Sequence, residues 1–279
     1  MTEISASLVK ELRDATNVGM MECKRALQEA NGDKDRAIQI LRERGVAIAG
    51  KKAGRTAKEG LIAAEVFNDG RSAVLIEVNC ETDFVARNDN FKAFVADLLE
   101  KAKACTGDLA AEVEADMVAK VTEIGENLKL GRHARFEREG EGALASYVHL
   151  GGKVGVLVEL SCEKPETGKT DLCREIIKDL TLHIAACNPS YLDRTEVPAD
   201  EVAAEREIYA KQVEGKPAAI LEKIVEGKLN KFYSQVCLRE QAFVKDGDQS
   251  VTQWLTAAGK ALNDTLTISR YLRVQVGVA

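Results

Sequence analysis

Apolar residues recur at helical spacing three times within the first 45 residues. The runs centre on Leu8, Val9 and Leu12, on residues 20–27, and on Ala37, Ile38 and Leu41. Ser5 or Ser7 can cap the first helix, and Asn31-Gly32 is typical of a helix C-terminus. Asp33 can cap the third helix, which we expect to end at Gly45. The pattern predicts a three-helix N-terminal module.

A basic, glycine-rich stretch without large apolar residues follows at residues 50–60 and predicts a linker. Beyond it, residues 60–81 align without gaps on residues 142–163, at an offset of 82. Each copy consists of two alternating runs around a glycine turn, which predicts a β-hairpin followed by a helix. The identical pairs include Gly60/Gly142, Gly70/Gly152, Glu77/Glu159, Cys80/Cys162 and Glu81/Glu163.

A second register relates the ends of the two copies. Residues 128–136 match residues 266–274 at an offset of 138, and both are alternating strands that we expect to pair with the hairpin of their own half. The change of offset leaves about 56 extra residues in the second half, between Cys187 and Val244. Their pattern predicts a helical hairpin, which either projects as a contact or dimerisation element or folds back on its own subunit.

Composition narrows the class of protein. The chain has 279 residues, 45% of them hydrophobic and 30% charged, with a net charge of −6. It can therefore bury a core, and no apolar run approaches the length of a membrane span. The N-terminus lacks the basic and apolar regions of a signal peptide, and the seven cysteines form no CxC or CxxC pair. These features favour a cytoplasmic multidomain protein and exclude membrane, secreted and fibrous classes.

Candidate catalytic chemistry is sparse. The segment from Gly45 to Lys52 approaches a phosphate-binding loop, but a lysine stands where the metal-binding hydroxyl belongs. His183 and Cys187 share a helix face, yet no second pair would complete a zinc site. We therefore expect no metal, no cofactor and no enzyme activity. The alternative function is RNA binding through the basic linker, by Lys51, Lys52, Arg55 and Lys58.

The two copies diverge directly after their shared Cys-Glu dipeptide. The first copy continues with residues 82–88 and places Phe84 in this loop, whereas the second has no aromatic residue between 164 and 168. The fold therefore does not require Phe84. Its ring either packs beneath the next helix, with Phe91 and Phe94, or is exposed as an anchor for a protein partner. Met20 and Met21 pose a similar choice, because adjacent residues on a helix cannot both face one core.

Several motifs together resemble bacterial elongation factor Ts. They span nearly the whole chain in the expected order. The motifs are residues 8–13, Thr16-x-x-Gly19-Met20-Met21-x-Cys23-Lys24, Asn79-Cys80-Glu81-Thr82-Asp83-Phe84-Val85-Ala86, Ile124-Gly125-Glu126-Asn127, His183-Ile184-Ala185-Ala186, and residues 215–228.

The resemblance implies an α+β fold. Residues 1–54 would form a three-helix module similar to ubiquitin-associated domains, together with the basic linker. A duplicated core of antiparallel sheets with helices would follow, as subdomains 55–140 and 141–279. The helical hairpin, at about residues 188–230, would be a dimerisation element inserted in the second copy.

The resemblance also implies a guanine-nucleotide exchange factor for the translational GTPase elongation factor Tu. By the family's pattern, Thr82, Asp83, Phe84 and Val85 enter the GTPase near its magnesium site and promote GDP release, with no need of nucleic acid. A second contact surface would comprise Arg13, Met20, Met21 and Lys24, and the core contacts would be Ile124 and His149. Some relatives carry a further C-terminal helix, whereas this sequence stops at Ala279.

Overall fold

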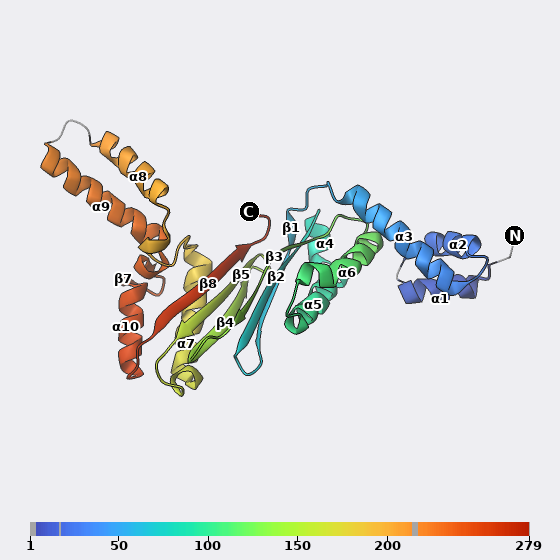
Figure 1. The fold of residues 1–279 in the computed structure, drawn as a ribbon, viewed down its shortest axis with the longest axis horizontal. Helices are drawn as coiled ribbons and strands as arrows, with labels where there is room; N and C mark the ends of the chain where they lie inside the picture. The colour runs from blue at the N-terminus through green and yellow to red at the C-terminus, as the bar shows by residue number, and fades with distance from the viewer. Residues whose placement is uncertain (1–3, 17, 214–216, 279) are drawn as a thin grey trace.

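The structure is a computed structural model that describes residues 4–16, 18–213 and 217–278. Figure 1 shows an elongated arrangement, with the N-terminal helices at one end, two β-sheets in the middle and a helical pair at the other end. Among the described residues, every helix is too short or too polar to cross a bilayer. The helices and the antiparallel sheets together form an α+β fold, as the sequence predicted.

Three helices form the N-terminal end: α1 (Ala6–Thr16), α2 (Met20–Glu29) and α3 (Lys34–Lys52). The hydroxyl of Ser5 accepts a hydrogen bond from the first turn of α1, and the Asp33 carboxylate accepts one from Arg36 N at 3.0 Å. Asn31 and Gly32 adopt positive φ and terminate α2. Leu12, Cys23 and Leu27 are among the residues of a small, separate core. The predicted caps at Ser5 and Asp33 and the predicted stop at Asn31-Gly32 are confirmed.

The predicted end of α3 at Gly45 is wrong, since the helix continues to Lys52. Gly45 is buried, and a Cβ atom there would lie 3.1 Å from the Thr122 hydroxyl of α6. The glycine allows α3 to approach α6 closely, and this tertiary contact outweighs the low helix propensity of glycine. Lys52 then donates a hydrogen bond to the Gly125 carbonyl. The linker is thus confined to the residues between α3 and the first strand.

The first sheet has the order β1-β2-β3, from β1 (Glu59–Phe67), β2 (Ser72–Cys80) and β3 (Lys129–Glu137). All pairs are antiparallel, so the predicted hairpin and its third strand are confirmed. The short α4 (Asp83–Arg87) follows β2, and α5 (Asp89–Ala104) and α6 (Leu109–Ile124) complete the layer. Every residue of β2 is buried because it lies between two strands and two apolar layers.

The second sheet repeats this order as β4-β5-β8, from β4 (Gly142–His149), β5 (Val154–Ser161) and β8 (Thr267–Gln275). Its outer face packs on α7 (Asp171–Cys187) and α10 (Val251–Ala261). The small strands β6 (Ala242–Phe243) and β7 (Asp246–Ser250) precede α10. Three short 3₁₀ helices complete the described elements: η1 (Thr167–Lys169), η2 (Arg194–Glu196) and η3 (Leu238–Glu240).

The two sheets pack face to face around a shared apolar cluster that includes Leu75 and Leu157. Buried glutamates tie the halves together. Glu77 accepts a hydrogen bond from Arg132 of its own sheet at 3.1 Å and another from Gly277 N, also at 3.1 Å, after the last strand of the other sheet. Glu159 binds Arg270 and Glu139 N in the corresponding way, at 2.7 and 3.0 Å. Each buried charge is therefore paired and hydrogen-bonded, as burial demands.

The helical pair consists of α8 (Ala199–Gln212) and α9 (Ala218–Val236). Its own small apolar clusters, which include Val225 and Phe232, hold the helices together. Figure 1 shows the pair projecting away from the sheets, so it does not fold back on the core. The turn that the sequence predicts at Gly215 and Lys216 lies outside the described residues.

Two glycine substitutions test these assignments. Gly50 lies in the exposed last turns of α3 with no atom near its Cβ position, so Gly50→Ala should raise the free energy of unfolding by roughly 0.5–1 kcal/mol. Gly60 has φ +147°, and a Cβ atom there would lie 2.2 Å from Val78 O. Gly60→Ala should therefore lower the free energy of unfolding by about 2 kcal/mol or more. Urea unfolding measures both. A neutral Gly50→Ala would contradict the extension of α3.

Candidate protein-contact site

The loop after β2 exposes an aromatic residue that the corresponding loop of the second half lacks. Thr82 caps α4, since its hydroxyl accepts a hydrogen bond from Val85 N at 3.3 Å. Ala86 faces the core, whereas the side chain of Phe84, two residues earlier on the opposite side of the turn, is 82% exposed. Phe91 and Phe94 are buried beneath. The alternative in which Phe84 packs with them is therefore wrong.

A single carboxylate fixes the backbone of this loop. Glu126 Oε2 accepts hydrogen bonds from the amides of Glu81 and Thr82, both at 3.0 Å, and Oε1 accepts one from the Thr82 hydroxyl at 2.6 Å. Glu81 in turn accepts a bond from Asn127 N at 2.6 Å. Charge-assisted bonds of this kind are the stronger ones in proteins. We call the three bonds to Glu126 the Glu126 clasp; sequence reasoning did not identify this role for the residue.

The second half has a corresponding clasp without an aromatic residue. Asp264 accepts bonds from the amides of Glu163 and Lys164, both at 3.1 Å, and from the Thr167 hydroxyl at 2.5 Å. The Thr167 hydroxyl, followed by these amides, lowers the pKa of Asp264 to about 2. A carboxylate clasp therefore belongs to the framework, and the exposed ring is an addition to one copy.

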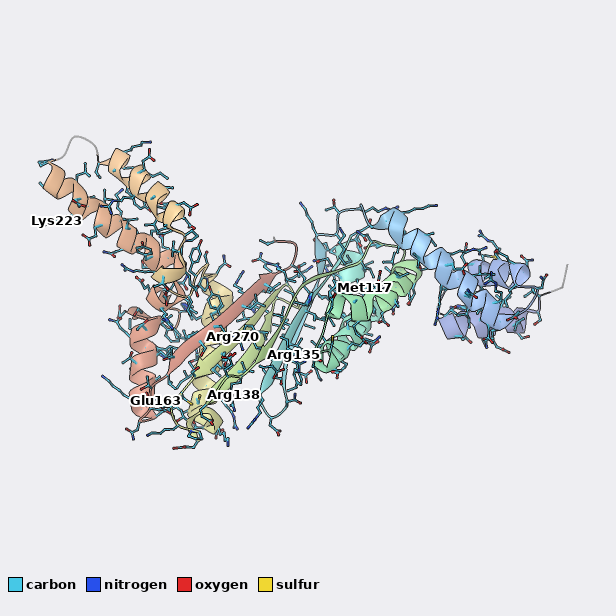
Figure 2. All side chains as sticks on the ribbon, viewed as in Figure 1. Met117, Arg135, Arg138, Glu163, Lys223 and Arg270 are labelled. Carbon is cyan, nitrogen blue, oxygen red and sulfur yellow. The ribbon has the colours of Figure 1, made fainter. Side chains whose placement is uncertain are left out.

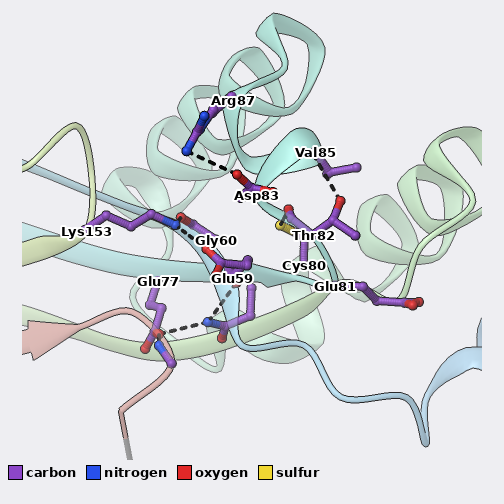
Figure 3. Close-up of polar contacts among 12 residues, drawn as sticks. Glu59, Gly60, Glu77, Cys80, Glu81, Thr82, Asp83, Val85, Arg87 and Lys153 are labelled. Carbon is purple, nitrogen blue, oxygen red and sulfur yellow. Dashed lines mark hydrogen bonds and ion pairs between the residues drawn. The ribbon is translucent and has the colours of Figure 1, made fainter.

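Figure 3 shows the remaining polar groups around the loop. Asp83 forms an ion pair with Arg87 at 3.1 Å, on the surface, where such a pair contributes little to stability. Lys153, from the turn after β4, pairs with Glu59 at 2.6 Å and brings that turn beside the start of β1. The loop thus presents an apolar ring beside a carboxylate, with basic groups close by.

The other predicted contact residues lie on separate surfaces. Arg13, Met20, Met21 and Lys24 are all exposed on α1 and α2. The sequence required only one of the two methionines to be displayed, but the exposed fractions are 50% for Met20 and 62% for Met21. Because Cys23 and Leu27 fill the core side of α2, the side chains of both methionines remain exposed.

The two core positions differ in exposure. Ile124 is half-buried at the end of α6 and packs against the core of the first sheet. His149 is exposed at the end of β4, with its Nδ1 atom 2.7 Å from the Tyr147 hydroxyl and the two rings stacked. Leu150 follows in the turn after β4, with positive φ and a largely exposed side chain. The predicted contact residues therefore lie on several elements, from α1 to β4.

Candidate chemistry elsewhere is accounted for by structural roles. His183 is buried, its Nδ1 accepts a bond from Val244 N at 3.2 Å, and its Nε2 lies 3.0 Å from the Gln241 amide oxygen. Burial lowers the pKa of His183, so the ring is neutral. Within the described part of the chain, no three metal-ligating side chains are grouped. The near phosphate-binding loop from Gly45 lies inside α3 and cannot wrap a phosphate.

Comparison with known proteins places these features in a family. The sequence model described as "Elongation factor TS" matches residues 81–278, which include both clasps and the exposed ring. Proteins named elongation factor Ts from Trichlorobacter lovleyi and Nitratiruptor sp. are 43% and 45% identical to this chain, each alignment covering 98% of it and 93% of the relative. This chain belongs to the elongation factor Ts family. A further member, from Nitratidesulfovibrio vulgaris, is 41% identical over 98% of this chain and 96% of its own length.

Family membership confirms the resemblance drawn from the sequence motifs and identifies the chain as a translation elongation factor. The matched region contains residues 81–86 of the motif carrying Phe84 and the whole motif carrying Glu126. In the fold these two motifs, separated by more than forty residues, are joined by the Glu126 clasp.

Hydrogen exchange tests the clasp. Glu126→Gln keeps the size of the side chain but removes its charge, so we expect the amides of Glu81 and Thr82 to exchange at least about tenfold faster. Asp264→Asn is the matched control and should instead accelerate exchange at Glu163 and Lys164. Unchanged protection of Glu81 and Thr82 in Glu126→Gln would show that the loop is held by other contacts.

Proposed function

We propose that this chain is a guanine-nucleotide exchange factor for elongation factor Tu, acting in the cytoplasm by inserting residues 82–85 near the magnesium site of that GTPase. The observation that carries the proposal is the 82% exposed ring of Phe84 on a loop held by Glu126. The corresponding loop of the second half has no aromatic residue, so the framework does not require this ring, and an exposed aromatic side chain suits an anchor for a protein partner.

The mechanism needs no reaction in this chain. Burying the Phe84 ring removes about 150 Å² of apolar surface from water, a gross stabilisation of about 4 kcal/mol before ordering costs. If the ring fits only a GTPase with a distorted magnesium site, this factor selects that state and GDP binding weakens. Linkage makes the effect mutual, because GDP must weaken binding of the factor by the same ratio.

The clasp contributes by preorganisation. Because Glu126 fixes the backbone of Glu81 and Thr82 before any partner is bound, the loop loses little conformational entropy on insertion. Asp83, beside the ring, offers a carboxylate to the partner once its surface pair with Arg87 is exchanged for other contacts.

The remaining contacts extend the proposed interface. Arg13, Met20, Met21 and Lys24 would form the N-terminal contact, and Ile124 and His149 the core contacts. The adaptable side chains of exposed methionines suit such a surface. The projecting α8–α9 pair exposes Ile208 and Ile220, which supports its proposed role in homodimerisation.

We also propose the finer organisation of the chain. Residues 1–54 form a module similar to ubiquitin-associated domains, and subdomains 55–140 and 141–279 are duplicates, the second with its inserted hairpin at about residues 188–230. The equal strand orders of the two sheets and the two matching clasps support the duplication. RNA binding through the basic segment is less favoured, because Lys52 and Arg55 contact Gly125 and Glu81 of the chain itself.

Removal of the ring is the direct test. Phe84→Ala should slow factor-stimulated GDP release from elongation factor Tu by at least about thirtyfold, the scale of a truncated hot-spot residue. Stopped-flow release of a fluorescent GDP measures the rate. Leu172→Ala, which trims another exposed apolar side chain in the second half, is the control and should leave the rate unchanged. Equal rates for Phe84→Ala and the original chain would overturn the proposal.

A double-mutant cycle tests whether Glu126 acts through the ring. Glu126→Gln should slow GDP release about tenfold when Phe84 is present, since the loop must then be ordered on binding. In the Phe84→Ala background it should cause no further loss. The same loss in both backgrounds would mean that Glu126 contributes independently of Phe84.

A further inference from the structure

A cavity of about 480 Å³ lies at the end of the sheets opposite to Phe84. It is bounded by the β1–β2 turn, the end of β3, the start of β4, and the segment from η1 into α7. Residues of both sheets therefore contribute to it. None of its lining residues belongs to the proposed exchange surface.

The charge of this cavity is opposite to that of the chain. Four cationic side chains line it, against the two carboxylates of Asp69 and Glu141, although the chain as a whole carries −6. The cations are Arg71, Arg138, Lys169 and Arg174. Within the described ranges only Arg174 has an ion pair, with Asp171 at 2.6 Å. The other three cations form no ion pair there, and they outnumber the two carboxylates of the lining, which favours binding of an anion.

Arg138 supplies a donor that lacks an acceptor. Its Nη1 atom donates a hydrogen bond to the Gly142 carbonyl at 2.6 Å, which holds the guanidinium at the start of β4. Its Nε atom is buried and has no hydrogen-bond partner in the structure. A buried unsatisfied donor on a charged group is costly, so an acceptor belongs there. Figure 2 marks Arg138 beside β4 and α7.

The corresponding corner of the other half shows that the framework does not need these cations. There Lys153, the counterpart of Arg71, pairs with Glu59 at 2.6 Å and donates to the Gly60 carbonyl at 3.2 Å. The counterpart of Arg138 at the offset of 138 is Val276. At that corner Lys153 forms these contacts and no arginine follows, whereas the cavity corner has an additional arginine, Arg138, which forms no ion pair among the described residues.

The walls of the cavity include apolar side chains as well as cations. Leu144, Pro165 and Ile177 line it together with the arginines. Its volume suits a small metabolite. We propose that this cavity binds a small phosphorylated molecule, with the phosphate on Arg71 and Arg138 and the organic part on the apolar wall. Guanidinium groups bind phosphate oxygens in bidentate fashion, which favours this class of anion.

Isothermal titration calorimetry of the full chain at low salt tests the proposal, with pyrophosphate and ADP as probes. We expect submillimolar binding of at least one, and at least about tenfold weaker binding by Arg71→Ala and by Arg138→Gln. Lys178→Ala, an exposed cation on α7 outside the cavity, is the matched control and should bind as the original chain does. Phe84→Ala should also bind normally, which separates this site from nucleotide exchange.

The two probes distinguish the sources of the phosphate. Tighter binding of ADP than of pyrophosphate would support an organic phosphate that uses the apolar wall, whereas binding of pyrophosphate alone would restrict the site to free oxyanions and overturn the organic part. No binding of either probe at millimolar concentration, or equal binding by Arg71→Ala and Lys178→Ala, would overturn the site. Arg71 makes no hydrogen bond through its side chain within the described residues, so its removal should leave the fold intact.

Discussion

The hydrogen bonds between the Glu126 carboxylate and the loop after β2 are the interaction on which the proposed function depends. Three donors of Glu81 and Thr82 converge on this one side chain. Glu126 follows the C-terminus of α6, more than forty residues after the loop in sequence. With the backbone held in this way, α4 can begin at once and its single turn directs Phe84 outward while Ala86 points inward. The protein thus presents a rigid apolar ring without a long protruding segment, which reduces the entropy lost on binding.

The two halves of the core use the same framework for different purposes. Both have a carboxylate clasp, a buried glutamate paired with an arginine, and a glycine with φ +147° at the start of the first strand. The first half adds the exposed ring after β2, and the second half leaves an open, cationic corner near Arg138. These two differences lie at positions that the framework shared by the two halves does not require.

Local sequence patterns predicted much of the fold. The caps at Ser5 and Asp33, the turn at Asn31-Gly32 and both β-hairpins depend on residues close together in sequence, and the structure has them. The error at Gly45 has a tertiary cause, because the glycine that predicted a helix end instead permits α3 to pack on α6. The clasp was also not predictable, since Glu126 and Thr82 meet only through the fold.

By itself the sequence determined the α+β class, the three N-terminal helices, the repeated hairpins and the family, since each follows from spacing, turn residues or motifs within short segments. Only the tertiary structure decided that Phe84 is exposed, that both methionines of α2 face outward and that the helical pair projects. The physical reason is that exposure depends on which surfaces are already covered. Burial of Phe91, Phe94 and Ala86 fills the space beneath the loop, and no local pattern records that this space is occupied.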